Sequence, residues 1–197
     1  MKKLLLERNL VSPISLLILM SIAMPVAFNA WSAMLNNFVV EKAAFTGVEI
    51  GILQSLREVP GFLSFTLIFV LLVIKEQTFA VFSLALLGLG VCLTGFFPTV
   101  YGLYFTTVLM SIGFHYFEAV KQSLSLQWLS KSEAPIVLGK LLAVGSLTSL
   151  IVYGCLWTLL EFFKLPYWIN FAIAGGICMG IALIMFLLFP SFPSKVE

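Results

Sequence analysis

The sequence predicts an all-α membrane protein whose chain crosses the bilayer as six transmembrane helices. Of its 197 residues, 61% are hydrophobic and only 10% are charged, whereas a soluble domain is about 45–50% apolar and about 25% charged. The mean hydropathy is +1.10. So few charges cannot cover the surface of a water-soluble globular protein. The composition therefore indicates a membrane protein.

Six apolar segments are long enough to cross the hydrocarbon core, which takes about 20 residues of α-helix. The first one is too long for the apolar core of a signal peptide, so we expect it to be retained as a span. Short connections make consecutive helices antiparallel. The predicted spans are 12–38, 47–74, 78–97, 101–129, 136–160 and 167–189, between an N-terminal segment (1–11) and a C-terminal tail (190–197).

Prolines mark where several of these helices begin, because proline fits the first helical turn. Within the first and second spans, Pro25 and Pro60 are expected to kink the helix. The prolines near helix starts are Pro13, Pro135 and Pro166, and Pro98 lies in the turn between the third and fourth spans.

The distribution of basic residues predicts the orientation, since cytoplasmic loops carry an excess of Lys and Arg. With the N-terminus inside, only Lys42 and Lys164 fall outside. The basic residues on or near the cytoplasmic side are then Lys2, Lys3, Arg8, Lys75, Lys131, Lys140 and Lys195. We therefore predict a multi-pass protein of the cell (inner) membrane, with both termini cytoplasmic and the lipid bilayer as its surroundings. The net charge of +2 is too small and scattered for a nucleic-acid partner.

The first, second, fourth and fifth spans carry polar residues at helical spacing, which places them on one face of each helix. A charge at the bilayer centre costs at least about 2.5–3.5 kcal/mol and is expected to face a bundle interior or a water-filled cavity. Lys121 borders the polar face of the fourth span and is expected near the cytoplasmic headgroups. The candidate pathway residues are Asn29, Gln54, Arg57, Glu58, His115, Glu118, Gln122 and Tyr153, with Ser146 and Ser149 on the face of Tyr153.

Two alternatives remain open for the charged residues. Arg57 could neutralise Glu58 or Glu118 and simply tie two helices together. His115 could be a packing residue or a group that exchanges protons.

The third and sixth spans have no ionisable group in their interiors, which predicts a supporting role. Their small residues are expected to let helix backbones approach closely. We also expect Trp31 and Trp168 at the outer membrane interface and Trp128 at the inner one. The glycines expected to pack are Gly88, Gly90, Gly95, Gly175, Gly176 and Gly180.

Two stretches carry a resemblance to a known family. One is Phe45-Thr46-Gly47-Val48-Glu49-Ile50-Gly51-Ile52-Leu53, and the other runs from Gly113-Phe114-His115 through Leu129-Ser130-Lys131-Ser132-Glu133-Ala134-Pro135 to Gly139. Together with the order of polar and apolar spans, they resemble the N-terminal half of a major facilitator superfamily (MFS) transporter. The resemblance implies two inverted three-helix repeats, with the first, second, fourth and fifth helices around a central cavity. The family's Gly-x-x-x-Asp-Arg-x-Gly-Arg loop is replaced by Ile74-Lys75-Glu76-Gln77-Thr78.

The resemblance implies transport of a small solute by alternating access. Arg57 could attract an anionic group, and His115 or a glutamate could couple transport to protons. Because a full transporter of that family has twelve spans, we expect a truncated product, or else a chain that pairs with a separate second half or with its own copy. The alternative is a non-transporting membrane subunit or an inert fragment.

No enzyme activity, cofactor or metal is expected from the sequence. His115 is the only histidine, there is no Asp, and no HExxH zinc motif occurs. Ser146 and Ser149 could face His115 but lack the setting of a nucleophilic serine.

Overall fold

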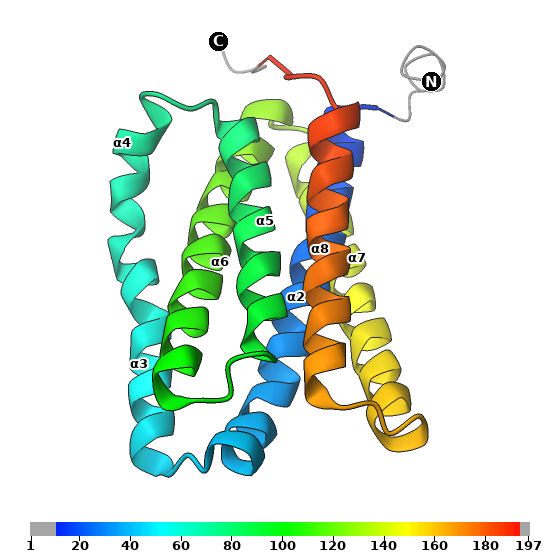
Figure 1. The fold of residues 1–197 in the computed structure, drawn as a ribbon. Coiled ribbons are helices and arrows are strands. Elements are labelled where there is room, and N and C mark those ends of the chain that lie inside the picture. Colours follow the sequence, from blue (N-terminus) through cyan, green and yellow to red (C-terminus); the bar gives the residue numbers. More distant parts are fainter. Residues whose placement is uncertain (1–10, 194–197) are drawn as a thin grey trace.

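The computed structural model describes residues 11–193, which form helices and no strand (Figure 1). The helices run up and down, so residues 11 and 193 lie at the same end of the bundle. In chain order the elements are α2 (Pro13–Ala43), α3 (Gly47–Phe62), η1 (Leu63–Thr66), α4 (Leu67–Leu71), α5 (Glu76–Thr94), α6 (Val100–Trp128), α7 (Ala134–Trp157), η2 (Thr158–Phe162) and α8 (Tyr167–Leu188).

Four helical stretches are long and apolar enough to cross a membrane, which confirms the all-helical, membrane-type class. They are Pro13–Ala43, Glu76–Thr94, Ala134–Phe162 and Tyr167–Leu188. The predicted spans 47–74 and 101–129 are not among these four. The first is divided into α3, η1 and α4, and the second corresponds to α6, whose polar residues lie at helical spacing. The count of six spans and the inverted repeats stay predictions.

Several predicted features of the termini lie outside the described residues. They are most of the N-terminal segment 1–11, the end of the tail 190–197, and the basic residues Lys2, Lys3, Arg8 and Lys195. The orientation of the bundle in the membrane therefore stays a prediction.

Side-chain caps fix where the first helices begin. Ser12 Oγ accepts a hydrogen bond from Ser15 N at the start of α2, at 3.1 Å. Thr46 and Glu49 form a capping box at the start of α3, in which Glu49 Oε2 accepts from Thr46 N at 2.8 Å. These oxygens satisfy backbone N–H groups that the helix itself leaves free.

The second predicted span is irregular beyond Pro60, while the kink expected at Pro25 stays a prediction. Helix α2 continues without interruption through Pro25. Beyond Pro60, however, the chain changes to the 3₁₀ segment η1. Tyr116 of α6 supports this break: its hydroxyl lies 2.5 Å from Thr66 Oγ1 and donates to Leu63 O at 3.3 Å. Such partners matter in a membrane, where water cannot satisfy freed backbone groups.

Helix α5 packs most extensively of all, against α6 on one side and α8 on the other. Glycines allow both approaches. A Cβ built on Gly90 would lie 2.5 Å from Met110 N of α6, and one on Gly175 of α8 would lie 2.6 Å from Cys92 N. The predicted packing of Gly176 and Gly180 is wrong, because no atom lies within 4 Å of a Cβ built on either residue.

The structure shows how the three tryptophans pack, while their depth in the membrane stays a prediction. Trp31 is 0% exposed within α2, so its ring packs on protein and not on lipid. Trp128 is buried at the end of α6, where its ring packs 5.6 Å from that of Phe192. Trp168 is exposed near the start of α8, beside Phe96.

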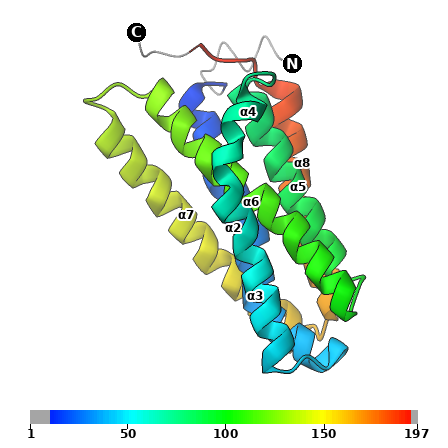
Figure 2. The ribbon, with the colours of Figure 1, turned by 90° about the vertical axis from the view of Figure 1, so that its left-hand side faces the viewer.

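Among the longer helices, α3 and α7 are the least covered, with two buried residues each. Helix α3 packs mainly on α6, and α7 packs mainly on α2 and makes little contact with α6. In Figure 2, α7 stands at the outer edge of the bundle. The space between α6 and α7 contains the candidate site.

Candidate functional site

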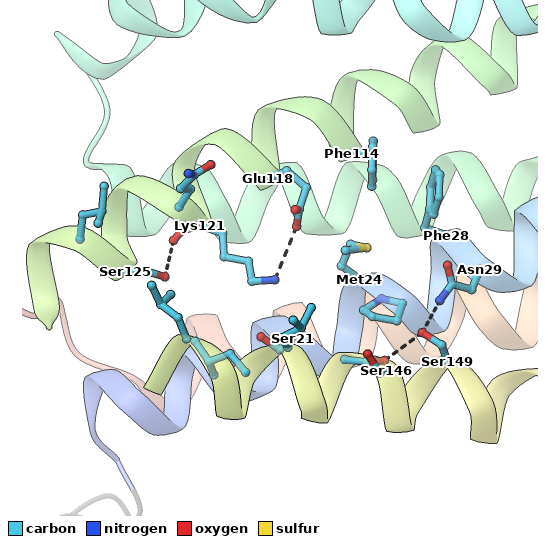
Figure 3. Close-up of a pocket in the computed structure, with 17 residues that line it drawn as sticks. Ser21, Met24, Phe28, Asn29, Phe114, Glu118, Lys121, Ser125, Ser146 and Ser149 are labelled. Atoms are coloured by element: carbon cyan, nitrogen blue, oxygen red, sulfur yellow. Dashed lines mark hydrogen bonds and ion pairs between the residues drawn. The ribbon is translucent and has the colours of Figure 1, made fainter. Parts of the chain in front are cut away.

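A cavity of about 540 Å³ lies between α2, α6 and α7 (Figure 3). Each of the three helices contributes polar side chains at helical spacing. Those that line the cavity are Ser21 and Asn29 of α2, Glu118, Lys121, Gln122 and Ser125 of α6, and Ser146 and Ser149 of α7. All three helices therefore contribute polar groups to a cavity whose other lining residues are mostly apolar.

The two charged groups of the cavity are neighbours on α6. Lys121 Nζ lies 3.5 Å from Glu118 Oε1, one helical turn away. The Lys121 side chain is only 19% exposed, and its ammonium lies 6.0 Å from the ring centre of Phe117. Glu118 Oε1 is buried without a hydrogen-bond partner among the described residues. Because water is partly excluded here, the attraction between the two charges is stronger than at a protein surface.

A hydrogen bond joins the two helices on the other side of the cavity. Asn29 Nδ2 of α2 donates to Ser149 Oγ of α7 at 2.7 Å, and Ser149 Oγ donates in turn to Gly145 O at 2.8 Å. Figure 3 shows both contacts. This side-chain bond holds the polar face of α7 toward the cavity.

Aromatic and aliphatic side chains close the remaining wall. The rings of Phe28 and Phe114 stack at 4.1 Å between centroids, with an interplanar angle of 14°. Met24 and Pro25 lie beside them on α2, and Leu142 completes the wall on α7. The cavity thus combines a charged and an apolar part.

Arg57, Glu58 and His115 form a separate charged cluster between α3 and α6. Arg57 Nη2 lies 2.6 Å from Glu58 Oε1, and His115 Nε2 lies 3.9 Å from Glu58 Oε2. Ser111 Oγ also donates a hydrogen bond to Arg57 O. Of the two predicted pairings of Arg57, the structure therefore has the one with Glu58, since Glu118 pairs with Lys121.

The structure brings together some of the predicted residues and separates others. Asn29, Glu118 and Gln122 line one cavity. Gln54 is partly exposed on α3, and Tyr153 is exposed on α7 outside that cavity. The Lys121 side chain lines the same cavity, and its expected position near the cytoplasmic headgroups stays a prediction.

Lys121 and Ser21 line the cavity although neither was among the predicted pathway residues. Lys121 follows Glu118 at i+3, and Ser21 precedes Pro25 and Asn29 at steps of four. Both spacings place the residues on the polar faces already recognised. Periodicity therefore contained a signal for both.

A second cavity, of about 580 Å³, lies between α5, α6 and the α3–η1–α4 stretch. Ser83 and Tyr116 supply its hydroxyls, and its other lining residues are apolar. Val59 and Phe82 at its edge are exposed, so this cavity opens onto the apolar exterior. It offers no charge to a polar solute, unlike the cavity between α2, α6 and α7.

Metal binding has no support within residues 11–193, where no group of three His, Cys, Asp or Glu residues is placed to hold an ion. Comparison of the chain with protein-family models, with curated proteins and with solved structures finds no match.

Proposed function

We propose that this chain is the solute-binding bundle of a membrane transporter that moves a small polar solute by alternating access. The observation that supports the proposal most directly is the Glu118–Lys121 pair in a cavity of about 540 Å³. Charged groups inside membrane bundles are costly, and they commonly mark substrate and ion pathways. A structural role alone would not require an open cavity beside them.

The proposed transporter is of the MFS type and lies in the cell membrane with both termini cytoplasmic. Alternating access needs two bundles that rock around a central site. We propose that a second six-helix half, or a second copy of this chain, supplies the opposing bundle. The exposure of most of α7 and α3 supports this arrangement, because both helices have faces available for a partner.

The cluster of Arg57, Glu58 and His115 is the proposed site of proton coupling. His115 Nε2 is 3.9 Å from Glu58 Oε2, and histidine is the side chain whose charge changes most readily near neutral pH. A proton on His115 would strengthen its attraction to Glu58 and so the contact between α3 and α6.

Replacing Glu118 with Gln is expected to lower solute uptake about 10–100-fold, because a hydrogen bond to a charged group contributes about 1.5–3 kcal/mol. The assay uses the full chain in proteoliposomes at a protein density that allows copies to pair. A defined mixture of isotope-labelled amino acids, sugars and carboxylates is supplied outside, and the vesicle contents are measured by mass spectrometry with and without a pH gradient.

The matched control is Glu161→Gln. Glu161 pairs with Lys164 at 3.0 Å with the same i, i+3 spacing, but on the exposed surface. Uptake by this variant should equal that of the parent protein. Vesicles that accumulate none of the solutes above the protein-free level would count against transport by this chain, and equal uptake by the two variants would remove Glu118 from the pathway.

A non-transporting membrane subunit is the second candidate function. The observation in its favour is that only 6% of the apolar 18-residue stretch within 134–162 is buried. This leaves most of α7 open to a partner. Under this reading a polar partner helix fills the cavity. Stable co-purification of one partner chain, together with absence of uptake, would favour it over transport.

A further inference from the structure

We infer that the cavity between α2, α6 and α7 recognises a small amphipathic zwitterion, of which an α-amino acid with an apolar side chain is the simplest example. The inference rests on the proposed function of the same cavity and names its class of substrate. Charge balance, hydrogen bonding and the apolar wall of the cavity each support it.

The charge balance of the lining favours a ligand that carries both signs. Glu118 and Lys121 are the charged residues among those that line the cavity. A ligand with one charge would satisfy one of them and leave the other with a displaced partner in a poorly solvated site, which is unfavourable. A zwitterion can place its ammonium beside Glu118 and its carboxylate beside Lys121, so that each charge keeps a partner.

The pair is also incompletely satisfied without a ligand. The distance of 3.5 Å between Lys121 Nζ and Glu118 Oε1 exceeds the usual 2.7–3.2 Å of an N–H···O hydrogen bond. An ammonium has three donors, while Glu118 Oε1 accepts no hydrogen bond among the described residues. The Glu118 side chain is still 41% exposed, so a ligand can reach the carboxylate.

The apolar wall selects for a hydrophobic substituent on that zwitterion. Phe114 precedes Glu118 by one helical turn on α6, Met24 lines the same cavity from α2, and Phe28 stacks on Phe114 (Figure 3). A ligand whose ammonium meets Glu118 would direct an adjacent apolar group against these side chains. Burial of that group adds affinity in proportion to its area, so glycine should bind more weakly than leucine.

The test measures binding of tritiated L-leucine to the full chain in detergent by scintillation proximity. Three unlabelled analogues of leucine are added as competitors. Leucinamide lacks the carboxylate, isocaproate lacks the ammonium, and glycine lacks the side chain. Each should compete at least about tenfold more weakly than leucine, which corresponds to about 1.4 kcal/mol. Absence of saturable leucine binding, or competition by isocaproate or leucinamide as strong as that by leucine itself, would overturn the inference.

Variants assign the two ends of the ligand. Glu118→Gln should weaken leucine about 10–100-fold while leaving isocaproate unchanged, and Lys121→Met should weaken leucine but not leucinamide. Glu161→Gln and Lys164→Met alter the exposed pair and should change neither. Glu118→Asp and Lys121→Arg keep the charges, so they should retain binding within a few-fold even where the neutral variants fold poorly. Loss of binding in both charge-keeping variants, with normal elution as a folded protein, would contradict the assignment.

Transport and ligand class can fail separately. If vesicles accumulate a sugar or a carboxylate in a Glu118-dependent manner but the protein does not bind leucine, the zwitterion is overturned and the proposed transport stands. If the protein binds leucine but the vesicles accumulate no solute, the ligand class stands and transport is overturned.

Discussion

Replacing Gly175 with Ala is expected to destabilise the bundle by about 2–3 kcal/mol, whereas the same change at the adjacent Gly176 has no such cost. A methyl group on Gly175 would overlap Gly88 O and lie 2.6 Å from Cys92 N of α5. These are backbone atoms, so α5 and α8 must separate, and overpacking of this kind typically costs about 1–3 kcal/mol. A Cβ at Gly176 meets no atom within 4 Å.

The two variants make a matched pair because they lie on the same helix and gain the same helix propensity from alanine. The free energy of unfolding can be measured in mixed micelles by titration with a denaturing detergent, followed by circular dichroism. Equal stability of the two variants would show that α5 and α8 do not pack through Gly175.

Replacing Trp31 with Ala is expected to cost about 3 kcal/mol of unfolding free energy. Trp31 is 0% exposed and belongs to the main apolar core. Lipid tails are as apolar as a protein interior, so the loss is chiefly that of packing contacts and of the cavity left behind. Large-to-small changes of Phe or Trp in a core typically cost about 3–5 kcal/mol.

Trp157→Ala is the control for this substitution, because Trp157 of α7 is 67% exposed and its removal leaves no internal void. Trp31→Phe adds a second comparison. Trp31 Nε1 is buried without a hydrogen-bond partner among the described residues, so phenylalanine removes an unsatisfied donor while keeping most of the ring. It should cost less than alanine. A cost for Trp31→Ala no larger than that for Trp157→Ala would contradict the buried position.

The class of fold was predictable because apolar runs near the length of a membrane span are conspicuous in the sequence. What hydropathy could not distinguish was burial in protein from exposure to lipid, since both surroundings are apolar. Trp31 shows this limit directly: its neighbours on α2 are equally apolar whether the ring faces lipid or protein. Gly175 and Gly176 show it again, because consecutive helical residues point about 100° apart and only the neighbouring α5 decides which of them packs.

The candidate site was predictable to the extent that it follows from helical spacing. Periodicity identified Asn29, Glu118 and Gln122, which the structure brings to one cavity. It could not tell which helices approach one another, so it grouped Arg57 with them although Arg57 pairs with its own neighbour Glu58. Pro60 predicted an irregularity here, but the sequence could not show that the chain changes to 3₁₀ geometry, because residues 63–72 form a nearly unbroken apolar run.

The loose position of α7 makes the cavity mechanically compliant. Two walls belong to α2 and α6, which are joined to α5 and α8 by the main packing of the bundle, but the third wall rests largely on α2 alone. The hydrogen bond from Asn29 to Ser149 is a side-chain contact that ties this third wall to α2. The width of the cavity is thus set by a softer interface than the one that holds the bundle together.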